Sequence, residues 1–139
     1  MDASKRKIKR IVVGGTSGGW IEELAYSAEL VVSKNSMRFI RTPEVETEEN
    51  EARSFSYNTD SPLFVEKYEK LCGLIPELVK HDQSDFMVMD AGAVSVEVFY
   101  SKSETRRMVF YDINDVLNSF LDILETMVPK CENPIASFR

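Results

Sequence analysis

The sequence predicts an α+β fold, in which a twisted, mainly antiparallel sheet of about five to seven strands packs one face against two amphipathic helices. Short segments with β-strand patterning occur in runs that are separated by turn residues. One helical pattern follows the first run and a second comes late in the chain, whereas a parallel fold would alternate strands and helices. A chain of 139 residues that is 43% hydrophobic can bury one core, so we expect a single domain over residues 1–139.

Strands are expected before the first helix. Alternating apolar residues from Ile8 to Val13 predict a strand that ends where a run of glycines begins. Residues 20–33 fit both a two-residue and a helical period, and we favour a strand because Lys34-Asn35-Ser36 is typical of a hairpin turn. A later segment places Phe55 and Tyr57 on one face of a short strand. The strands expected in this half of the chain are residues 8–13, 20–33, 37–41 and 53–58.

A first amphipathic helix is expected after these strands. Asp60 or Ser61 can cap it, and Pro62 suits its first position, where the missing N–H costs nothing. Apolar residues then recur at three- and four-residue steps as far as Leu78. Pro76 interrupts this pattern because proline cannot donate to the carbonyl four residues back, so we expect a kink or a fresh short turn there.

The second half of the chain is expected to form an antiparallel ribbon and a closing helix. The ribbon strands are residues 86–89, 94–100 and 108–111. The helix has a broad apolar stripe from Val116 to Val128, and either Asp112 or Asn114 can cap it. We expect the short tail, residues 130–139, either to fray or to dock through its apolar residues. Those residues are Pro134, Ile135 and Phe138.

Charge is distributed unevenly along an acidic chain. Lys and Arg total 17 against 23 Asp and Glu, so the net charge is −6, and nucleic-acid binding is not expected. The N-terminal segment, residues 1–10, is basic, and its positive charges lie between Lys5 and Arg10. We interpret this segment as a solvated terminus or a charged sheet edge. Residues 43–52 are interpreted as an acidic, solvated loop. Its glutamates are Glu44, Glu46, Glu48, Glu49 and Glu51.

Several classes of protein are not expected from the composition. No apolar run approaches the roughly 20 residues that span a bilayer, and no secretory signal precedes the first strand, so we expect a cytoplasmic protein with no membrane partner. The chain has two cysteines, and Cys72 lies in an apolar helical pattern, so a disulfide framework is not expected. One histidine leaves too few ligands for a zinc site, and we expect neither a metal nor a cofactor.

A glycine-rich segment, residues 14–20, is the sharpest indication of a site. It matches the motif Gly-x-Ser-x-Gly through Gly15, Ser17 and Gly19. In a hydrolase this motif holds a nucleophilic serine, with His81 here as the one available base and Asp60 as the acid that would orient it. Hydrolases of that fold normally need a parallel sheet and a longer chain, so we favour a structural glycine bulge or turn.

The same segment could instead bind a small ligand. Its backbone amides could form an anion-binding nest, and the candidate ligand-binding residues are Gly15, Ser17, Gly18, Trp20 and Glu22. Glu22 could also act with Asp90 or Glu97 as an acid and base, although a carboxylate on a sheet more often pairs with a cross-strand cation. The cations available for such a structural pair are Arg106 and Arg107.

These observations favour a non-enzymatic interaction or regulatory module. Adjacent aromatic residues, as in Phe99-Tyr100 and Phe110-Tyr111, place rings on both faces of a strand, and the helices can cover only one of those faces. We therefore expect the open face or an edge of the sheet to meet another protein or a second copy of the chain. The alternative is a small-ligand binder or serine-type hydrolase that uses the segment from Gly14 to Trp20.

Overall fold

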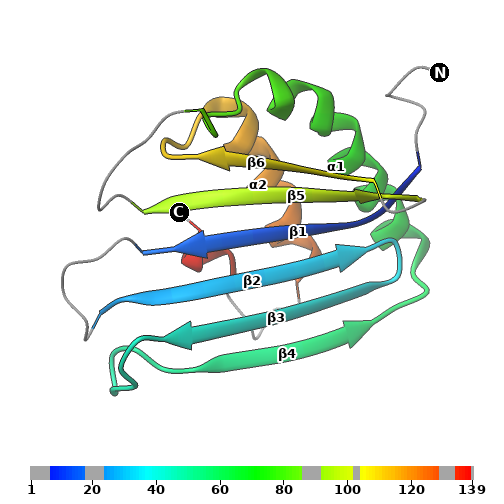
Figure 1. Cartoon of the computed structure of the whole chain (residues 1–139). Coiled ribbons are helices and arrows are strands. Elements are labelled where there is room, and N and C mark those ends of the chain that lie inside the picture. The colour runs from blue at the N-terminus through cyan, green and yellow to red at the C-terminus, as the bar shows by residue number, and fades with distance from the viewer. Residues whose placement is uncertain (1–6, 18–23, 86–91, 102–103, 129–133, 139) are drawn as a thin grey trace.

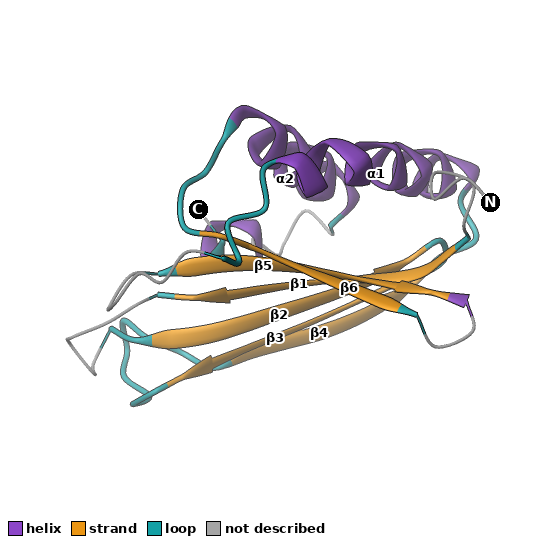
Figure 2. Cartoon of the chain, turned by 45° about the horizontal axis from the view of Figure 1, so that its top comes forward, coloured by secondary structure: helices purple, strands orange, loops and turns teal. Residues whose placement is uncertain are grey.

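In the computed structural model, a six-stranded antiparallel sheet in the order β4-β3-β2-β1-β5-β6 carries two helices on one face (Figures 1 and 2). The structure describes residues 7–17, 24–85, 92–101, 104–128 and 134–138. This arrangement confirms the α+β fold. The elements are β1 (Ile8–Thr16), β2 (Tyr26–Ser33), β3 (Ser36–Pro43), β4 (Arg53–Asn58), α1 (Pro62–Lys80), β5 (Ala93–Tyr100), β6 (Thr105–Phe110), α2 (Asp115–Met127) and the 3-10 helix η3 (Pro134–Ser137).

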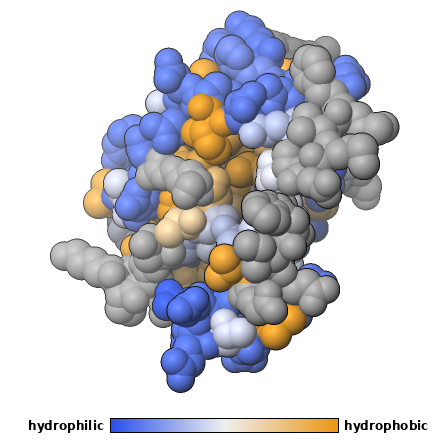
Figure 3. All heavy atoms as spheres, turned by 90° about the vertical axis from the view of Figure 1, so that its left-hand side faces the viewer, coloured by the Kyte–Doolittle hydropathy of each residue, from blue (hydrophilic) through white to orange (hydrophobic). Residues whose placement is uncertain are grey.

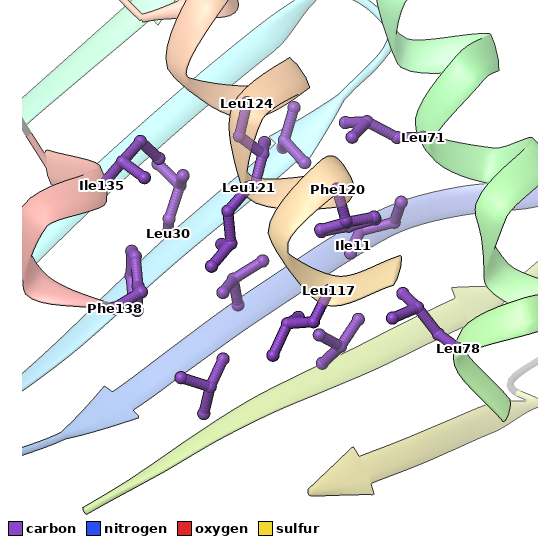
Figure 4. Close-up of a cluster of buried hydrophobic side chains, with 14 of the residues drawn as sticks. Ile11, Leu30, Leu71, Leu78, Leu117, Phe120, Leu121, Leu124, Ile135 and Phe138 are labelled. Carbon is purple, nitrogen blue, oxygen red and sulfur yellow. The ribbon is translucent and has the colours of Figure 1, made fainter. Parts of the chain in front are cut away.

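The core lies between the helices and the inner face of the sheet. Alternate strand residues such as Ile11 and Leu30 are fully buried against α2, because successive side chains of a strand point to opposite faces. Figure 4 shows Phe120 and Leu121 of α2 projecting toward these strands. The tail docks on the same core, since Ile135 and its neighbours Pro134 and Phe138 are buried.

The ends of the two helices show which of the alternative capping residues and turns the protein uses. Asn114, and not Asp112, caps α2, because its Oδ1 accepts a hydrogen bond from the Leu117 N–H at 2.8 Å. Pro62 occupies the start of α1, as expected. The fresh turn expected at Pro76 is not found, because α1 continues through it to Lys80. Pro76 is exposed, so water can hydrate the carbonyl that its ring leaves without a donor. No described helix is both long enough and apolar enough to span a bilayer.

Two strand boundaries differ from the sequence prediction. β1 does not end at Val13 but continues in regular antiparallel pairing as far as Thr16. β2 begins at Tyr26, while Leu24 and Ala25 precede it and residues 18–23 lie outside the description. The strand expected at residues 86–89 also lies outside the described residues. The other expected strands are confirmed within one or two residues at each end, apart from β6, which starts three residues earlier than expected.

The chain itself covers the end of one edge strand of the sheet. After α1, the Gln83 N–H donates to the Val109 carbonyl of β6 at 2.8 Å, and the Val109 N–H donates to Asp82 Oδ1 at 3.0 Å. Gln83 Oε1 then accepts from the Tyr111 N–H at 2.6 Å. These bonds occupy the outward backbone groups of Val109, so the C-terminal end of β6 is not free to pair with another strand.

Asp82 makes the stability of this covered edge dependent on pH. Burial opposes ionisation of its carboxyl, but hydrogen bonds from Val109 and Ser84 and the charge of Arg106 outweigh burial and lower the pKa below the ordinary 3.8. A carboxyl whose pKa is lowered on folding stabilises the fold above the unfolded-state pKa, and this stabilisation is lost as the pH falls through the folded-state pKa.

We expect Asp82→Asn to lose about 1 kcal/mol of unfolding free energy at neutral pH, because the charge that strengthens these hydrogen bonds is removed. Between roughly pH 5 and pH 2 its stability should fall less than that of the wild type. Urea unfolding across this range measures both effects, with the exposed Asp85→Asn as the control for charge removal. Equal pH dependence in Asp82→Asn and the wild type would contradict the assignment.

Candidate functional site: the open face of the sheet

The helices leave one face of the sheet uncovered by any described element (Figure 2). We call this the open face. It carries the strand residues that alternate with the buried ones, and many of them are small or hydroxylated. On β1, β2, β3, β5 and β6 these residues include Arg10, Val12, Gly14, Thr16, Ser27, Glu29, Val31, Arg38, Ile40, Thr42, Ala93, Ser95, Glu97, Phe99, Arg107 and Val109.

A hollow of about 310 Å³ lies on the open face around Gly14. In the register of the sheet, Gly14 stands between Glu29 of β2 and Ser95 of β5, so the position at the centre of the hollow has no side chain. A Cβ atom placed on Gly14 would lie 2.7 Å from Ser95 Oγ. The larger side chains of Ile40 and Arg107 also line the hollow. The hollow therefore exists because the central strand carries glycine at this position.

Charged side chains border the hollow. Glu29 of β2 and Arg107 of β6 both line it, from the strands that flank β1 and β5. Glu97 stands directly across from Arg107 in the pairing of β5 with β6. The cross-strand neighbour of Arg107 is thus Glu97, whereas Glu22 and Asp90 lie outside the described residues. Opposite charges on neighbouring strands favour this register, which accounts for both residues without catalysis.

Gly15 faces the opposite side of the sheet and has a different role. A Cβ on Gly15 would lie 2.7 Å from Phe138 Cδ1 and 3.2 Å from the Ser137 carbonyl oxygen. The C-terminal segment is held there by Tyr26, whose hydroxyl donates to the same Ser137 carbonyl at 2.8 Å. Figure 3 looks onto this end of the molecule, where hydrophobic atoms gather at the centre between hydrophilic ones. Gly15 is needed so that the tail can close on the core.

These contacts correct the interpretation of the glycine-rich segment. Gly14 and Gly15 form neither a loop nor a bulge, because both pair regularly with β2 and β5. One glycine opens a hollow on the outer face and the other admits the tail on the inner face. Of the remaining candidates in this segment, Gly18, Gly19, Trp20 and Glu22 lie outside the described residues.

Ser17 closes the pairing of β1 with β2. Its N–H donates to the Tyr26 carbonyl at 3.1 Å, and its Oγ accepts from the Tyr26 N–H at 3.0 Å. A nucleophilic serine instead needs its hydroxyl bonded to a general base. The Ser17 hydroxyl therefore acts in the described structure as a substitute for a backbone acceptor at the end of the ladder.

The remaining members of the hydrolase hypothesis are not brought together. Asp60 precedes α1 and His81 follows it, and a helix of 19 residues separates the two by about 28 Å along its axis. His81 is exposed and ends the helix through its N–H, which donates to the Leu78 carbonyl at 3.0 Å. Asp60 therefore cannot orient His81 as a base, and the acid–base pair that the motif requires is not formed.

A second polar region lies at the acidic loop. A cavity of about 360 Å³ is lined by Arg41 and Arg53 together with glutamates of the loop and residues of η3. Asn50 anchors the loop and is almost fully buried, since its Nδ2 donates to the Ala25 carbonyl at 2.9 Å. This anchoring role could not be predicted from the sequence, in which Asn50 is one polar residue among glutamates. The loop is further fastened by the Glu51 carbonyl, which accepts from Arg41 Nη1 of β3 at 2.8 Å, and by the Glu44 N–H, which donates to the Ala25 carbonyl at 2.8 Å. Most of its residues are exposed, as expected.

The cysteine of α1 is not activated for chemistry. Burial raises the pKa of the Cys72 thiol to about 11, and the charge of Glu69 acts in the same direction, although a hydrogen bond with Tyr68 opposes them. Burial likewise raises the pKa of Tyr68, whose hydroxyl donates to the Ile8 carbonyl at 3.2 Å. Because the thiolate is the reactive form, a neutral Cys72 is suited to packing.

The described residues thus offer a shallow hollow with polar walls, uncovered apolar strand residues around it, and no cluster of three or more potential metal ligands. The Ser17, His81 and Asp60 side chains, which the sequence suggested for hydrolysis, do not form a catalytic set. Comparison of the chain with protein-family models, with curated proteins and with solved structures finds no match.

Proposed function

We propose that this protein is a non-enzymatic interaction module, which binds another protein through the open face of its sheet. The uncovered face is the observation that carries the proposal. Val12 and Val31 are direct cross-strand neighbours on it, and Ile40 is 36% exposed beside the hollow. Apolar residues on an uncovered face surrounded by polar ones are typical of a protein-binding surface.

The hollow supplies a specific point of attachment for such a partner. A volume of about 310 Å³ can take a protruding partner side chain, and the surrounding hydroxyls of Ser27 and Ser95 can bond its polar atoms. Glu29 and Arg107 carry opposite charges at the hollow and would fix the orientation of the partner. We place this interaction in the cytoplasm, since the chain has few cysteines and no expected disulfide framework.

Gly14→Val tests the proposal by filling the hollow. Purified full-length protein is immobilised, and the proteins it captures from a cell extract are identified and quantified. We expect capture by Gly14→Val to fall about tenfold or more, since a side chain would occupy the attachment point. The matched control is Gly73→Val, because a Cβ at Gly73 on α1 meets no atom within 4 Å and lies away from the open face.

Circular dichroism should show that both variants remain folded. Equal capture of the same proteins by Gly14→Val and Gly73→Val would overturn the proposal. A small ligand in the same hollow is the alternative that its hydroxyl lining supports. That alternative would be favoured if small metabolites raised the melting temperature of the wild type and of Gly73→Val, but not of Gly14→Val, and no protein were captured.

A further inference from the structure

The two edges of the sheet are treated differently by the chain. The segment after α1 covers the C-terminal end of β6, where the Gln83 N–H donates to the Val109 carbonyl and the Val109 N–H donates to Asp82 Oδ1. At the other edge, β4 pairs with β3 on one side, and no described element lies beyond it (Figure 1). Five of the six residues of β4 are exposed, and Arg53 at its start is the one charged residue among them; charged residues and prolines often protect natural edges.

The outward backbone groups of β4 can be assigned from its pairing. The Thr59 N–H donates to the Asn35 carbonyl at 2.9 Å, in line with the register in which Asn58 faces Ser36. Successive residues of an antiparallel strand direct their N–H and C=O groups to opposite sides. Asn58, Ser56 and Ser54 therefore direct theirs away from β3, toward the uncovered edge.

Hydrophobic side chains are exposed beside the same edge. Tyr57 of β4 is 37% exposed, although it contacts the Phe64 ring of α1 with a centroid distance of 6.1 Å. Leu63, next to that phenylalanine, is 57% exposed. In both views the helix layer overlies mainly β1, β5 and β6, so the inner side of β4 is the least covered part of the core face (Figures 1 and 2).

We propose that β4 pairs antiparallel with β4 of a second copy of this chain, so that two sheets join into one of twelve strands, twice the six of one copy. The pairing is centred on Phe55, which places Ser54 opposite Ser56 of the second copy. Both serines direct backbone groups outward, so they form a hydrogen-bonded pair. This interface lies at the edge, and its formation is independent of the open-face function proposed above.

The pattern of β4 favours its own copy as the occupant. Serines lie on the open face and the aromatic residues on the inner face, so self-pairing brings serine opposite serine and Phe55 opposite Phe55. Within one copy Arg53 has Arg41 as its cross-strand neighbour, and both line the cavity that also holds glutamates of the acidic loop. In the dimer Arg53 faces Tyr57 of the second copy, where the exposed ring can accept the cation on its face.

Sedimentation of the full chain from roughly 1 µM to 1 mM tests for the dimer by mass action. We expect the mass to double with concentration, and Ser56→Pro to weaken dimerisation about tenfold or more, because proline removes an outward N–H without removing a bond to β3. Ser56→Ala keeps that N–H and should dimerise like the wild type. A monomer at all concentrations, or equal dimerisation of Ser56→Pro and Ser56→Ala, would overturn the proposal.

Cysteine pairing tests the register. In a background of Cys72→Ser and Cys131→Ser, the proteins Ser54→Cys and Ser56→Cys are oxidised separately and as a mixture. Residues that form a hydrogen-bonded pair have Cα atoms about 5.5 Å apart, within reach of a disulfide. We expect cross-linking in the mixture and little in either protein alone. The register centred on Phe55 would be contradicted if Ser56→Cys cross-linked with itself and the mixture gave no cross-link between Ser54→Cys and Ser56→Cys.

The outcome can be separated from that of the open-face proposal. Gly14→Val lies on β1, three strands from β4 in the sheet order, and should leave the dimer unchanged. Ser56→Pro should conversely leave the capture of other proteins through the hollow unchanged. A dimer lost in Gly14→Val and kept in Ser56→Pro would show that the copies meet through the open face, and would overturn the edge pairing.

Discussion

Gly15→Val is expected to lower the free energy of unfolding by about 3 kcal/mol, because its side chain would occupy the place of the C-terminal segment. The ideal Cβ lies 2.7 Å from the Phe138 ring and 3.2 Å from the Ser137 carbonyl, and the latter is backbone that cannot rotate away. Undocking the tail exposes Phe138 and Ile135, which are at most 3% exposed in the fold. Urea unfolding followed by circular dichroism measures the loss.

Gly14→Ala is the matched control for this change. It alters the neighbouring residue of the same strand, but its Cβ meets only Ser95 Oγ at close range, which is the end of a small side chain that can turn away. We expect a loss of about 1 kcal/mol or less. If both variants lost the same stability, the general cost of a side chain in β1 would explain the result, and the assigned role of Gly15 in docking the tail would be wrong.

Phe120→Ala is expected to cost about 4 kcal/mol, since removing a buried aromatic side chain loses its burial and leaves a cavity. Phe120 is fully buried, and Figure 4 shows it among Ile11 of β1, Leu117 of α2 and Leu71 of α1. The side chain therefore joins both helices to the sheet. Equilibrium unfolding in urea should show the lower midpoint, with a melting temperature lowered in parallel.

The control for Phe120→Ala is the adjacent exposed residue of the same helix. Ser119→Ala removes no buried atom and exchanges serine for a better helix former, so its stability should be equal to or slightly above that of the wild type. A loss below about 1 kcal/mol in Phe120→Ala would mean that the core collapses around the gap or that α2 is not fixed on the sheet as described.

Most of the fold could be predicted because its elements have strong local patterns. Alternating residues in β4 and the three- and four-residue spacing in α1 identify the element types before any tertiary contact is known. Pro76 shows the limit of a local rule. Proline disfavours a helix at its position, but the burial of Ile75 and Leu78 on the inner side of α1 outweighs that cost.

The candidate site was less predictable than the fold. The sequence drew attention to the glycines, but their role depends on which face of β1 each one occupies. Gly14 meets Ser95 and Gly15 meets Phe138, residues about eighty and more than a hundred positions further along the chain. The hydrolase hypothesis drawn from the motif Gly-x-Ser-x-Gly was wrong because it, too, depended on tertiary contacts. The Ser17 hydroxyl bonds Tyr26, and a helix separates the proposed acid from the proposed base.

The sequence by itself determined the α+β class, the acidic charge and the apolar faces of the strands and helices, because these depend on composition and on periods of a few residues. The tertiary structure alone decided the strand order, which places β4 at one edge and β6 at the other, where the segment after α1 bonds to Val109. The strand order and the pairing register arise from contacts between residues far apart in the chain. Local periodicity does not determine which distant strand becomes a neighbour.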